Sequence, residues 1–288
     1  YHWAKGHPEK IDIIGFEGSF HGRTLAAVNA SGNKAYLEGF GPRMPGFVQL
    51  PFGDMEALRA AVGPTTAAII VEPVQGEGGA RALSEQQLQE MRALCDETGT
   101  LLILDEIQCG LGRTGKLFAW EWASGVKPDI VAIAKALGGG FPVGACVTSA
   151  AAGAGMTVGA HGSTYGGNPL AMAVALASME ELTKPELMDN VREVSGYLTQ
   201  QFNGLKDRYP DVVLDIRGKG LLIGLKLATN NREFMQHARD QHLLLAGGGD
   251  NCVRLLPPLN LTLDEAREAV EKVERACEAA RAKAKSAA

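Results

Sequence analysis

The sequence has 288 residues, of which 45% are hydrophobic and 21% are charged, and its formal net charge is -5. These values are typical of a globular protein with a sizeable core, built as one large domain or two unequal domains. Acidic and basic residues are interspersed without a basic stripe, which argues against nucleic acid as a partner. Gly, Pro or a charge interrupts every apolar run before it reaches membrane-spanning length, so we expect no membrane segment.

The chain begins at Tyr1 without a signal-peptide pattern, and its first residues resemble the end of a helix leading into a strand. We therefore expect an N-terminal part of the protein to precede Tyr1. The cysteines form no CxxC pair and are odd in number, which favours buried free thiols in a reducing cytoplasm. They are Cys95, Cys109, Cys146, Cys252 and Cys277. His21 and His161 lack the spacing of metal ligands, so no metal is predicted.

Five short apolar runs predict strands, and their near-continuous Ile, Val and Leu content is typical of strands covered on both faces. They are Ile11–Phe16, Ala67–Val71, Leu101–Leu104, Asp129–Ala134 and Gly144–Thr148. Between two of these runs, Ser84–Glu97 has helical spacing, with Ser84 as N-cap and Gln87 in the capping-box position. The alternation predicts an α/β fold with a mostly parallel sheet and helices on both faces.

The second part of the chain has a different pattern. Asn168–Leu182 predicts a long Ala-rich helix, and Leu263–Ser286 predicts a charged amphipathic helix at the C-terminus. Short strands are expected at Val212–Asp215, Leu221–Leu225 and Val253–Leu256. We place a boundary near residue 183, with a large domain over residues 1–182 and a smaller α+β domain over residues 183–288.

Three of the predicted strands end in charged residues, Glu72, Asp105 and Lys135. Ligands of open α/β sheets bind at the carboxyl ends of the strands, so together these residues indicate a site, although one alone would suggest a solvated loop. Lys135 follows an apolar strand and precedes Gly138–Gly140. Such surroundings disfavour its charge and leave a nucleophilic amine, as Schiff-base chemistry requires. No GxGxxG follows a strand, so a dinucleotide site is a poor fit.

Five motifs occur in an order that resembles the class III, fold-type I aminotransferases, which depend on pyridoxal phosphate. They are FHGRT (Phe20–Thr24), VEPVQGEGG (Val71–Gly79), LLILDEIQCGLGRTG (Leu101–Gly115), DIVAIAKALGGGFPVGA (Asp129–Ala145) and HGSTYGGNPLA (His161–Ala171). Within that class the chain is most similar to the acetylornithine aminotransferases of arginine biosynthesis. The resemblance covers nearly the whole chain.

The resemblance implies the cofactor site. Lys135 is implied as the Schiff-base lysine, and Asp105 as the carboxylate that keeps the pyridine nitrogen of pyridoxal 5'-phosphate protonated. Phe20 is implied to stack on the cofactor ring, although core packing is the alternative for this side chain. Glu106, Ile107 and Gln108 are implied as cofactor neighbours, Gln108 near the phenolic oxygen. Thr164 is implied to bind the phosphate of the other subunit's cofactor, which predicts a homodimer with shared active sites.

The resemblance also implies which substrates bind. Arg23 is implied to hold the carboxylate far from the reacting carbon and Arg254 a carboxylate next to it, because guanidinium groups pair bidentately with carboxylates. Glu77 is implied as a switch that pairs with Arg254, and Ser163 as a further substrate contact. For each arginine a surface salt bridge is the alternative. The predicted reaction moves the terminal amino group of N-acetylornithine to 2-oxoglutarate, giving the semialdehyde and glutamate.

Family members also carry a Ser-Gly/Ala-Thr-Glu-Ala-like loop that cradles the cofactor phosphate at the start of a helix. We expect this loop to precede Tyr1, so residues 1–288 alone are expected to bind the cofactor more weakly than the complete protein. Succinylornithine, ornithine and 4-aminobutyrate stay open as donors. Two other functions stay open as alternatives to an aminotransferase: an aminomutase on the same fold, and an inactive fragment.

Overall fold

The computed structural model describes residues 1–287, with side chains as far as Lys283, and divides into two compact units. The first unit comprises Tyr1–Pro73, Leu83–Leu111 and Phe118–Glu181. The second comprises Val74–Ala82, Gly112–Leu117 and the chain from Leu182 onward. Two short segments of the N-terminal half therefore fold with the C-terminal unit.

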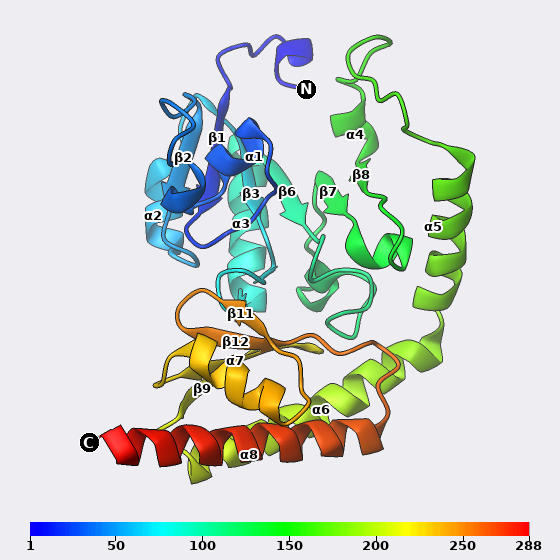
Figure 1. The fold of residues 1–288 in the computed structure, drawn as a ribbon. Coiled ribbons are helices and arrows are strands. Elements are labelled where there is room, and N and C mark those ends of the chain that lie inside the picture. The colour runs from blue at the N-terminus through cyan, green and yellow to red at the C-terminus, as the bar shows by residue number, and fades with distance from the viewer. Residues whose placement is uncertain (288) are drawn as a thin grey trace. The chain divides into compact units, whose positions relative to one another are not determined.

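A six-stranded sheet in the order β2-β1-β3-β6-β7-β8 forms the centre of the first unit (Figure 1). Its strands are β1 (Asp12–Phe16), β2 (Phe47–Leu50), β3 (Thr66–Val71), β6 (Leu101–Asp105), β7 (Ile130–Ile133) and β8 (Ala145–Thr148). Every neighbouring pair is parallel except β7 and β8. The predicted mostly parallel sheet is confirmed, and its parallel strands bring the carboxyl ends of β1, β3, β6 and β7 to one edge.

Helix α3 (Glu85–Thr98) shows why the sequence folds this way locally. The Ser84 hydroxyl accepts the amide of Gln87 and the Gln87 side chain accepts the amide of Ser84, so the predicted capping box is confirmed. Leu88 and Met91 are buried in one core cluster with Leu102 and Leu104 of β6. The other helices of this unit are α1 (Leu25–Ala30), α2 (Met55–Ala61), α4 (Ala150–Gly153), α5 (Pro169–Leu182) and the 3-10 turns η1 (Trp3–Lys5), η2 (Lys34–Tyr36), η3 (Ala119–Trp122) and η4 (Lys135–Gly138).

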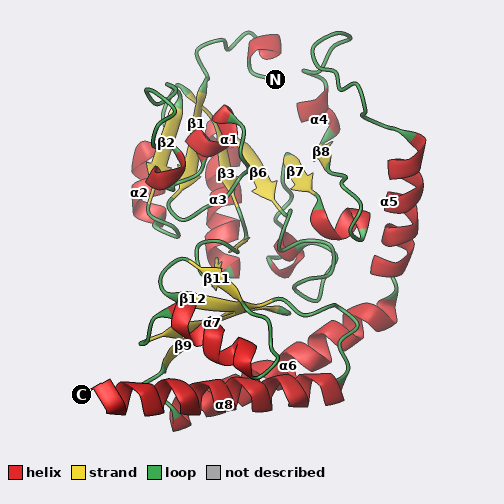
Figure 2. Ribbon diagram, in the orientation of Figure 1, coloured by secondary structure: helices red, strands yellow, loops and turns green. Residues whose placement is uncertain are grey.

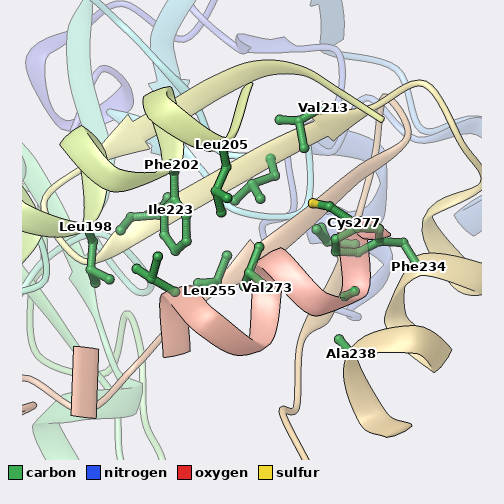
Figure 3. Close-up of a cluster of buried hydrophobic side chains, with 14 of the residues drawn as sticks. Leu198, Phe202, Leu205, Val213, Ile223, Phe234, Ala238, Leu255, Val273 and Cys277 are labelled. Carbon is green, nitrogen blue, oxygen red and sulfur yellow. The ribbon is translucent and has the colours of Figure 1, made fainter. Parts of the chain in front are cut away.

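The second unit holds an antiparallel sheet in the order β11-β12-β10-β9 and a two-stranded sheet of β4 and β5. Figure 2 labels β9, β11 and β12 of the larger sheet. The strands are β4 (Val74–Gln75), β5 (Arg81–Ala82), β9 (Val213–Lys219), β10 (Leu222–Leu227), β11 (Ala246–Gly248) and β12 (Cys252–Leu255), and the helices are α6 (Pro185–Arg208), α7 (Asn231–Asp240) and α8 (Leu263–Ala287). Figure 3 shows their core, where Phe202 of α6 and Val273 of α8 lie beside Ile223 and Leu255 of the sheet. All four side chains are at most 6% exposed.

Strand β8 differs from the expectation that it is covered on both faces. All four of its residues are exposed, so neither face of this strand is covered within the chain; β8 is an edge strand that pairs with β7, antiparallel. Cys146 lies on this strand and is therefore an exposed thiol, which corrects the expectation that every cysteine is buried. The other four cysteines are buried, and all five are free.

Several elements were not predicted from the sequence, chiefly β2, α6, α7 and β11. The predicted C-terminal helix is confirmed as α8, and the predicted helix over residues 168–182 as α5. Within residues 1–287, no helix combines the length and the apolar character needed to cross a bilayer.

Candidate active site

The predicted strand-end charges lie along one edge of the sheet. Ala132 of β7 pairs with Asp105 of β6, and Val71 of β3 pairs with Leu104. Glu72 therefore follows β3 beside the end of β6, and Lys135 comes three residues after the partner of Asp105. Parallel pairing brings these residues to the edge at which open α/β sheets bind ligands.

Asp105 is a buried carboxylate, 4% exposed, with two hydrogen bonds. Its Oδ1 accepts the amide of Ile107 at 3.1 Å, and its Oδ2 lies 2.8 Å from Nδ1 of His21. An ionised carboxylate offers about four acceptor positions, so capacity for a further donor remains. The arrangement can hold a protonated ring nitrogen, because a buried negative charge favours a positive partner.

His21 is a site residue that the sequence analysis missed. Its Nδ1 lies 2.8 Å from Oδ2 of Asp105 and can donate a hydrogen bond to this carboxylate when the ring proton is on Nδ1. Its Nε2 is buried without a hydrogen-bond partner among residues 1–287. The ring therefore orients the Asp105 carboxylate, although the two residues are 84 positions apart in the sequence. The available signal was its place within FHGRT, between two residues already assigned to the site.

Lys135 does not have the desolvated environment that the sequence analysis expected. The residue is exposed in this chain; β7 ends at Ile133, and Lys135 is the first residue of η4. Lys135 has a φ of 48°, a left-handed conformation that is uncommon for a residue with a side chain. Backbone strain of this kind is found at functional sites, where the surrounding structure fixes it.

The three residues after Asp105 have different environments: Glu106 is buried, whereas Ile107 and Gln108 are partly exposed. The Glu106 carboxylate has no exposed surface and accepts the amides of Ala119 and Trp120, each at 2.9 Å. Burial raises the pKa of Glu106 to about 7, against the opposing effect of these hydrogen bonds. Glu106 thus anchors the η3 turn inside the protein, whereas Ile107 and Gln108 are partly exposed.

Phe20 and Arg23 lie together in the loop after β1. The Phe20 amide lies 3.4 Å from Oε1 of Glu72, which joins this loop to the end of β3. The Cζ atom of Arg23 lies 5.2 Å from the Phe20 ring centroid and 4.0 Å from that of Tyr36. Tyr36 is a second residue that the sequence analysis did not single out.

Ser163 and Thr164 lie in an exposed turn before α5, in which the Gly166 amide donates to the Ser163 carbonyl at 3.3 Å. Within the described part of the chain, neither side chain hydrogen-bonds to the residues around Asp105. The structure therefore does not bring these two predicted residues to the others within one chain.

The second unit brings Glu77 and Arg254 together, as the resemblance implies. Arg254 Nη2 donates to Glu77 Oε1 at 2.9 Å. The same guanidinium donates to the Gly247 carbonyl from Nη2 at 2.6 Å and from Nε at 3.1 Å. The Arg254 side chain is 6% exposed and that of Glu77 is 40% exposed. The arginine is therefore the buried, fixed partner and the glutamate is the accessible one.

These residues fit pyridoxal phosphate by the chemistry of their donors. A buried carboxylate with free acceptor capacity, an amine after the neighbouring strand and an aromatic side chain meet three needs of the cofactor, for its ring nitrogen, its aldehyde and its ring face. Oxygen and nitrogen atoms of His21, Glu72 and Asp105 also lie within 4.8 Å of one another, a spacing open to a cation. The direct contact of His21 with Asp105 uses two of these atoms, and the absence of a metal stays a prediction.

Comparisons with known proteins agree with this chemistry. The family model described as aminotransferase class-III matches residues 1–277. Acetylornithine aminotransferase 2 of Caulobacter vibrioides is 69% identical over 285 residues, which are 99% of this chain and 70% of that protein. Acetylornithine aminotransferase of Brucella melitensis is 56% identical over 96% of this chain and 69% of its own length.

Solved structures give the same result. N-acetylornithine aminotransferase of Stenotrophomonas maltophilia superposes with a TM-score of 0.82 at 35% identity, over 98% of this chain and 70% of that one. Ornithine aminotransferase of Toxoplasma gondii gives 0.91 at 32% identity, over 96% of this chain and 66% of that one. The chain thus spans between about two thirds and 70% of the length of these relatives. It belongs to the class III aminotransferases, a family of pyridoxal-phosphate-dependent transferases.

Proposed function

We propose that the protein transfers the terminal amino group of N-acetylornithine to 2-oxoglutarate, in arginine biosynthesis. The observation that carries the proposal is the Glu77–Arg254 pair of 2.9 Å, because a reaction that alternates between two kinds of donor needs a carboxylate receptor that can be opened and closed. The identity of 69% to an acetylornithine aminotransferase supports this donor.

Lys135 and Asp105 carry the chemistry in this proposal. When bound, pyridoxal phosphate supplies an aldehyde that takes up the amino group and a ring that accepts electron density. Asp105 holds the proton on the ring nitrogen, and His21 keeps its carboxylate oriented. Lys135 would supply the amine that holds the cofactor aldehyde, and its free amine would move a proton as general base and then general acid. Phe20 would contact the ring face of the bound cofactor, and Ile107 and Gln108 would be further neighbours of it.

The two arginines sort the substrates. Arg23 takes the carboxylate that both substrates carry far from the reacting carbon. Arg254 takes the carboxylate that only glutamate and 2-oxoglutarate carry beside it. With acetylornithine bound, Glu77 pairs with Arg254 and so offsets the cost of an uncompensated buried guanidinium. Since Gly247 also fixes Arg254, Glu77 is the partner that moves.

The assembly and location follow from the same assignments. We propose a homodimer with shared active sites, in which Ser163 and Thr164 act on the other subunit; their exposure in this chain supports that role. We propose the first unit as the pyridoxal-phosphate-binding domain and the second as the small domain; these units differ from the predicted division near residue 183, because Val74–Ala82 and Gly112–Leu117 belong to the second. Five free thiols suit a cytoplasmic location.

Ornithine is the second candidate donor, favoured by the TM-score of 0.91 to an ornithine aminotransferase. The test is an assay of the complete, cofactor-loaded protein with 2-oxoglutarate and a panel of N-acetylornithine, succinylornithine, ornithine and 4-aminobutyrate. We expect glutamate to form from every turnover and kcat/KM to be highest for N-acetylornithine. A higher value for another donor would overturn the substrate assignment. Consumption of a donor without glutamate would favour an aminomutase, and no turnover at all would favour an inactive fragment.

A further inference from the structure

Arg23 is held by aromatic rings instead of by a carboxylate. Its guanidinium carbon lies 4.0 Å from the Tyr36 ring centroid and 5.2 Å from the Phe20 centroid. The two rings meet edge to face, with centroids 5.9 Å apart and an interplanar angle of 87°. As far as side chains are described, to Lys283, no acidic side chain lies within ion-pair distance of Arg23, which is itself exposed. Among the residues whose side chains are described, its N–H donors also have no hydrogen-bond acceptor, so they are uncommitted there.

The support is a built feature of the fold, because the segment that carries Tyr36 is tied to the loop that carries Arg23. The His21 amide donates to the Ser31 hydroxyl at 3.0 Å, and the Gly32 amide donates to the Ser19 hydroxyl at 3.3 Å. Both serines are at most 2% exposed. A Cβ at Gly32 would lie 2.3 Å from the Cα of Glu17, so this close approach requires glycine.

The choice of a ring as support has a chemical consequence. A carboxylate that fixed Arg23 would occupy the N–H donors that a substrate carboxylate needs, and the substrate would have to displace it. A ring contacts the flat face of the guanidinium and leaves the donors at its edge available for bidentate pairing. Arg254 is the contrast in the same molecule, because Glu77 does occupy one of its donors.

We infer that Tyr36 is a specificity-determining residue, whose ring holds Arg23 ready for the carboxylate that lies far from the reacting amine. The inference rests on the proposed function, in which Arg23 receives that carboxylate. Arg23 and Tyr36 together select amino donors that end in a carboxylate over donors that lack one. Because the ring leaves the donor edge unoccupied, Arg23 serves both half-reactions without a switch.

The experiment compares two donors that differ only in this carboxylate, N-acetylornithine and its decarboxylated analogue N-acetylputrescine. In the cofactor-loaded enzyme, Tyr36→Leu is expected to lower kcat/KM for N-acetylornithine about tenfold, mainly through KM, which corresponds to about 1.4 kcal/mol. The value for N-acetylputrescine is expected to stay within about twofold, since the ring supports only the carboxylate receptor. Tyr36→Phe keeps the ring and is expected to restore most of the loss. Phe40→Leu, in the same segment and 67% exposed, is the matched control.

Equal losses with both donors would overturn the inference and assign Tyr36 a structural role. A Tyr36→Phe variant as impaired as Tyr36→Leu would also overturn it, because the hydroxyl would then be the active group. Binding of glutarate, a dicarboxylate that cannot react, gives a readout without turnover, and calorimetry should show affinity about tenfold weaker in Tyr36→Leu. Unchanged affinity would contradict the inference. Failure of the wild-type enzyme to use N-acetylornithine would instead refute the proposed function, and the glutarate comparison would still decide the role of Tyr36.

Discussion

Glu106 stands beside the proposed pyridine partner and yet has a different kind of role. Its carboxylate is fully buried, and its hydrogen bonds to the amides of Ala119 and Trp120 stabilise the charged form only in part. Desolvation is the larger effect and raises the pKa of Glu106 to about 7. The carboxylate therefore gains a proton in the folded protein within the neutral range, where a solvated glutamate would be ionised.

This shift predicts how stability depends on pH. The folded state binds the proton more tightly than the unfolded state, so Glu106 favours folding fully below pH 4.5, and this contribution is lost as pH rises to about 7. The loss is on the order of 3 kcal/mol. For Glu106→Gln, the free energy of unfolding is measured by urea denaturation across this pH range. It should no longer show the decrease with rising pH that Glu106 causes in the wild type. Glu121→Gln, a more accessible acid nearby, should keep it. Equal slopes in wild type and Glu106→Gln would contradict the assignment.

Individual site residues were predictable where their signal was local. Asp105 and Lys135 follow apolar strands and precede distinctive sequence, so the sequence alone predicts both as site residues, and these assignments stay predictions. His21 and Tyr36 could not be predicted in this way, because each acts through a neighbour that only the fold supplies. The contact of His21 with Asp105 spans 84 positions, and the stacking of Tyr36 on Arg23 depends on a loop closed by buried serines.

At the level of elements, strands with apolar runs were predicted to within two residues, as β1, β3, β6 and β7 show. Strand β11 was missed because Ala246–Gly248 carries no hydrophobic pattern, and it forms only through pairing with β12. The error at β8 has a related cause. Apolar residues in a strand do not reveal whether other elements cover its faces, since that depends on long-range packing: edge strand β2 is mostly half-buried, whereas edge strand β8 is exposed.

The turn between β4 and β5 shows how one element positions another. The Gly249 amide donates to the Glu77 carbonyl at 2.7 Å, which fastens this turn to the β11–β12 hairpin. Gly79 has a φ of +96°, and a Cβ there would lie 2.6 Å from the Gly249 carbonyl oxygen. Position 79 thus requires glycine for two reasons, its positive φ and the close approach of the Gly249 carbonyl.

Gly79→Ala is therefore expected to destabilise the second unit by roughly 1–3 kcal/mol through backbone strain and the clash with Gly249. It should also weaken 2-oxoglutarate binding, because the displaced hairpin carries Gly247, which fixes Arg254. Thermal unfolding and KM for 2-oxoglutarate measure the two effects.

Gly196→Ala is the matched control in the same unit, since its Cβ would meet nothing within 4 Å and it lies in α6. That change should stabilise the helix by roughly 0.5–1 kcal/mol. A neutral Gly79→Ala would show that the hairpins are not coupled.

For the whole molecule, the order of motifs indicated the family, but the sequence did not predict that two short segments of the N-terminal half fold with the second unit. Val74–Ala82 and Gly112–Leu117 fold with the second unit although the first unit surrounds them in sequence. Arg113 shows how such a segment is held, with hydrogen bonds from Nη1 to the carbonyls of Leu221 at 3.3 Å and Pro257 at 2.5 Å. Burial lowers the pKa of Arg113 to about 10. Partners more than a hundred positions away leave no local pattern to detect.

Whether active sites are shared between subunits can be tested by complementation. If Thr164 serves the other subunit, a heterodimer of Lys135→Ala and Thr164→Asp chains has one site with both wild-type residues and one site with neither. If Thr164 serves its own chain, each site carries one defect, because the introduced carboxylate would repel the cofactor phosphate. We therefore expect heterodimers, co-expressed with two affinity tags, to reach about half the wild-type rate although each parent homodimer is nearly inactive. Thr157→Asp, in the same exposed segment, is the control and should leave its homodimer active. Heterodimers as inactive as their parents would rule out the shared site.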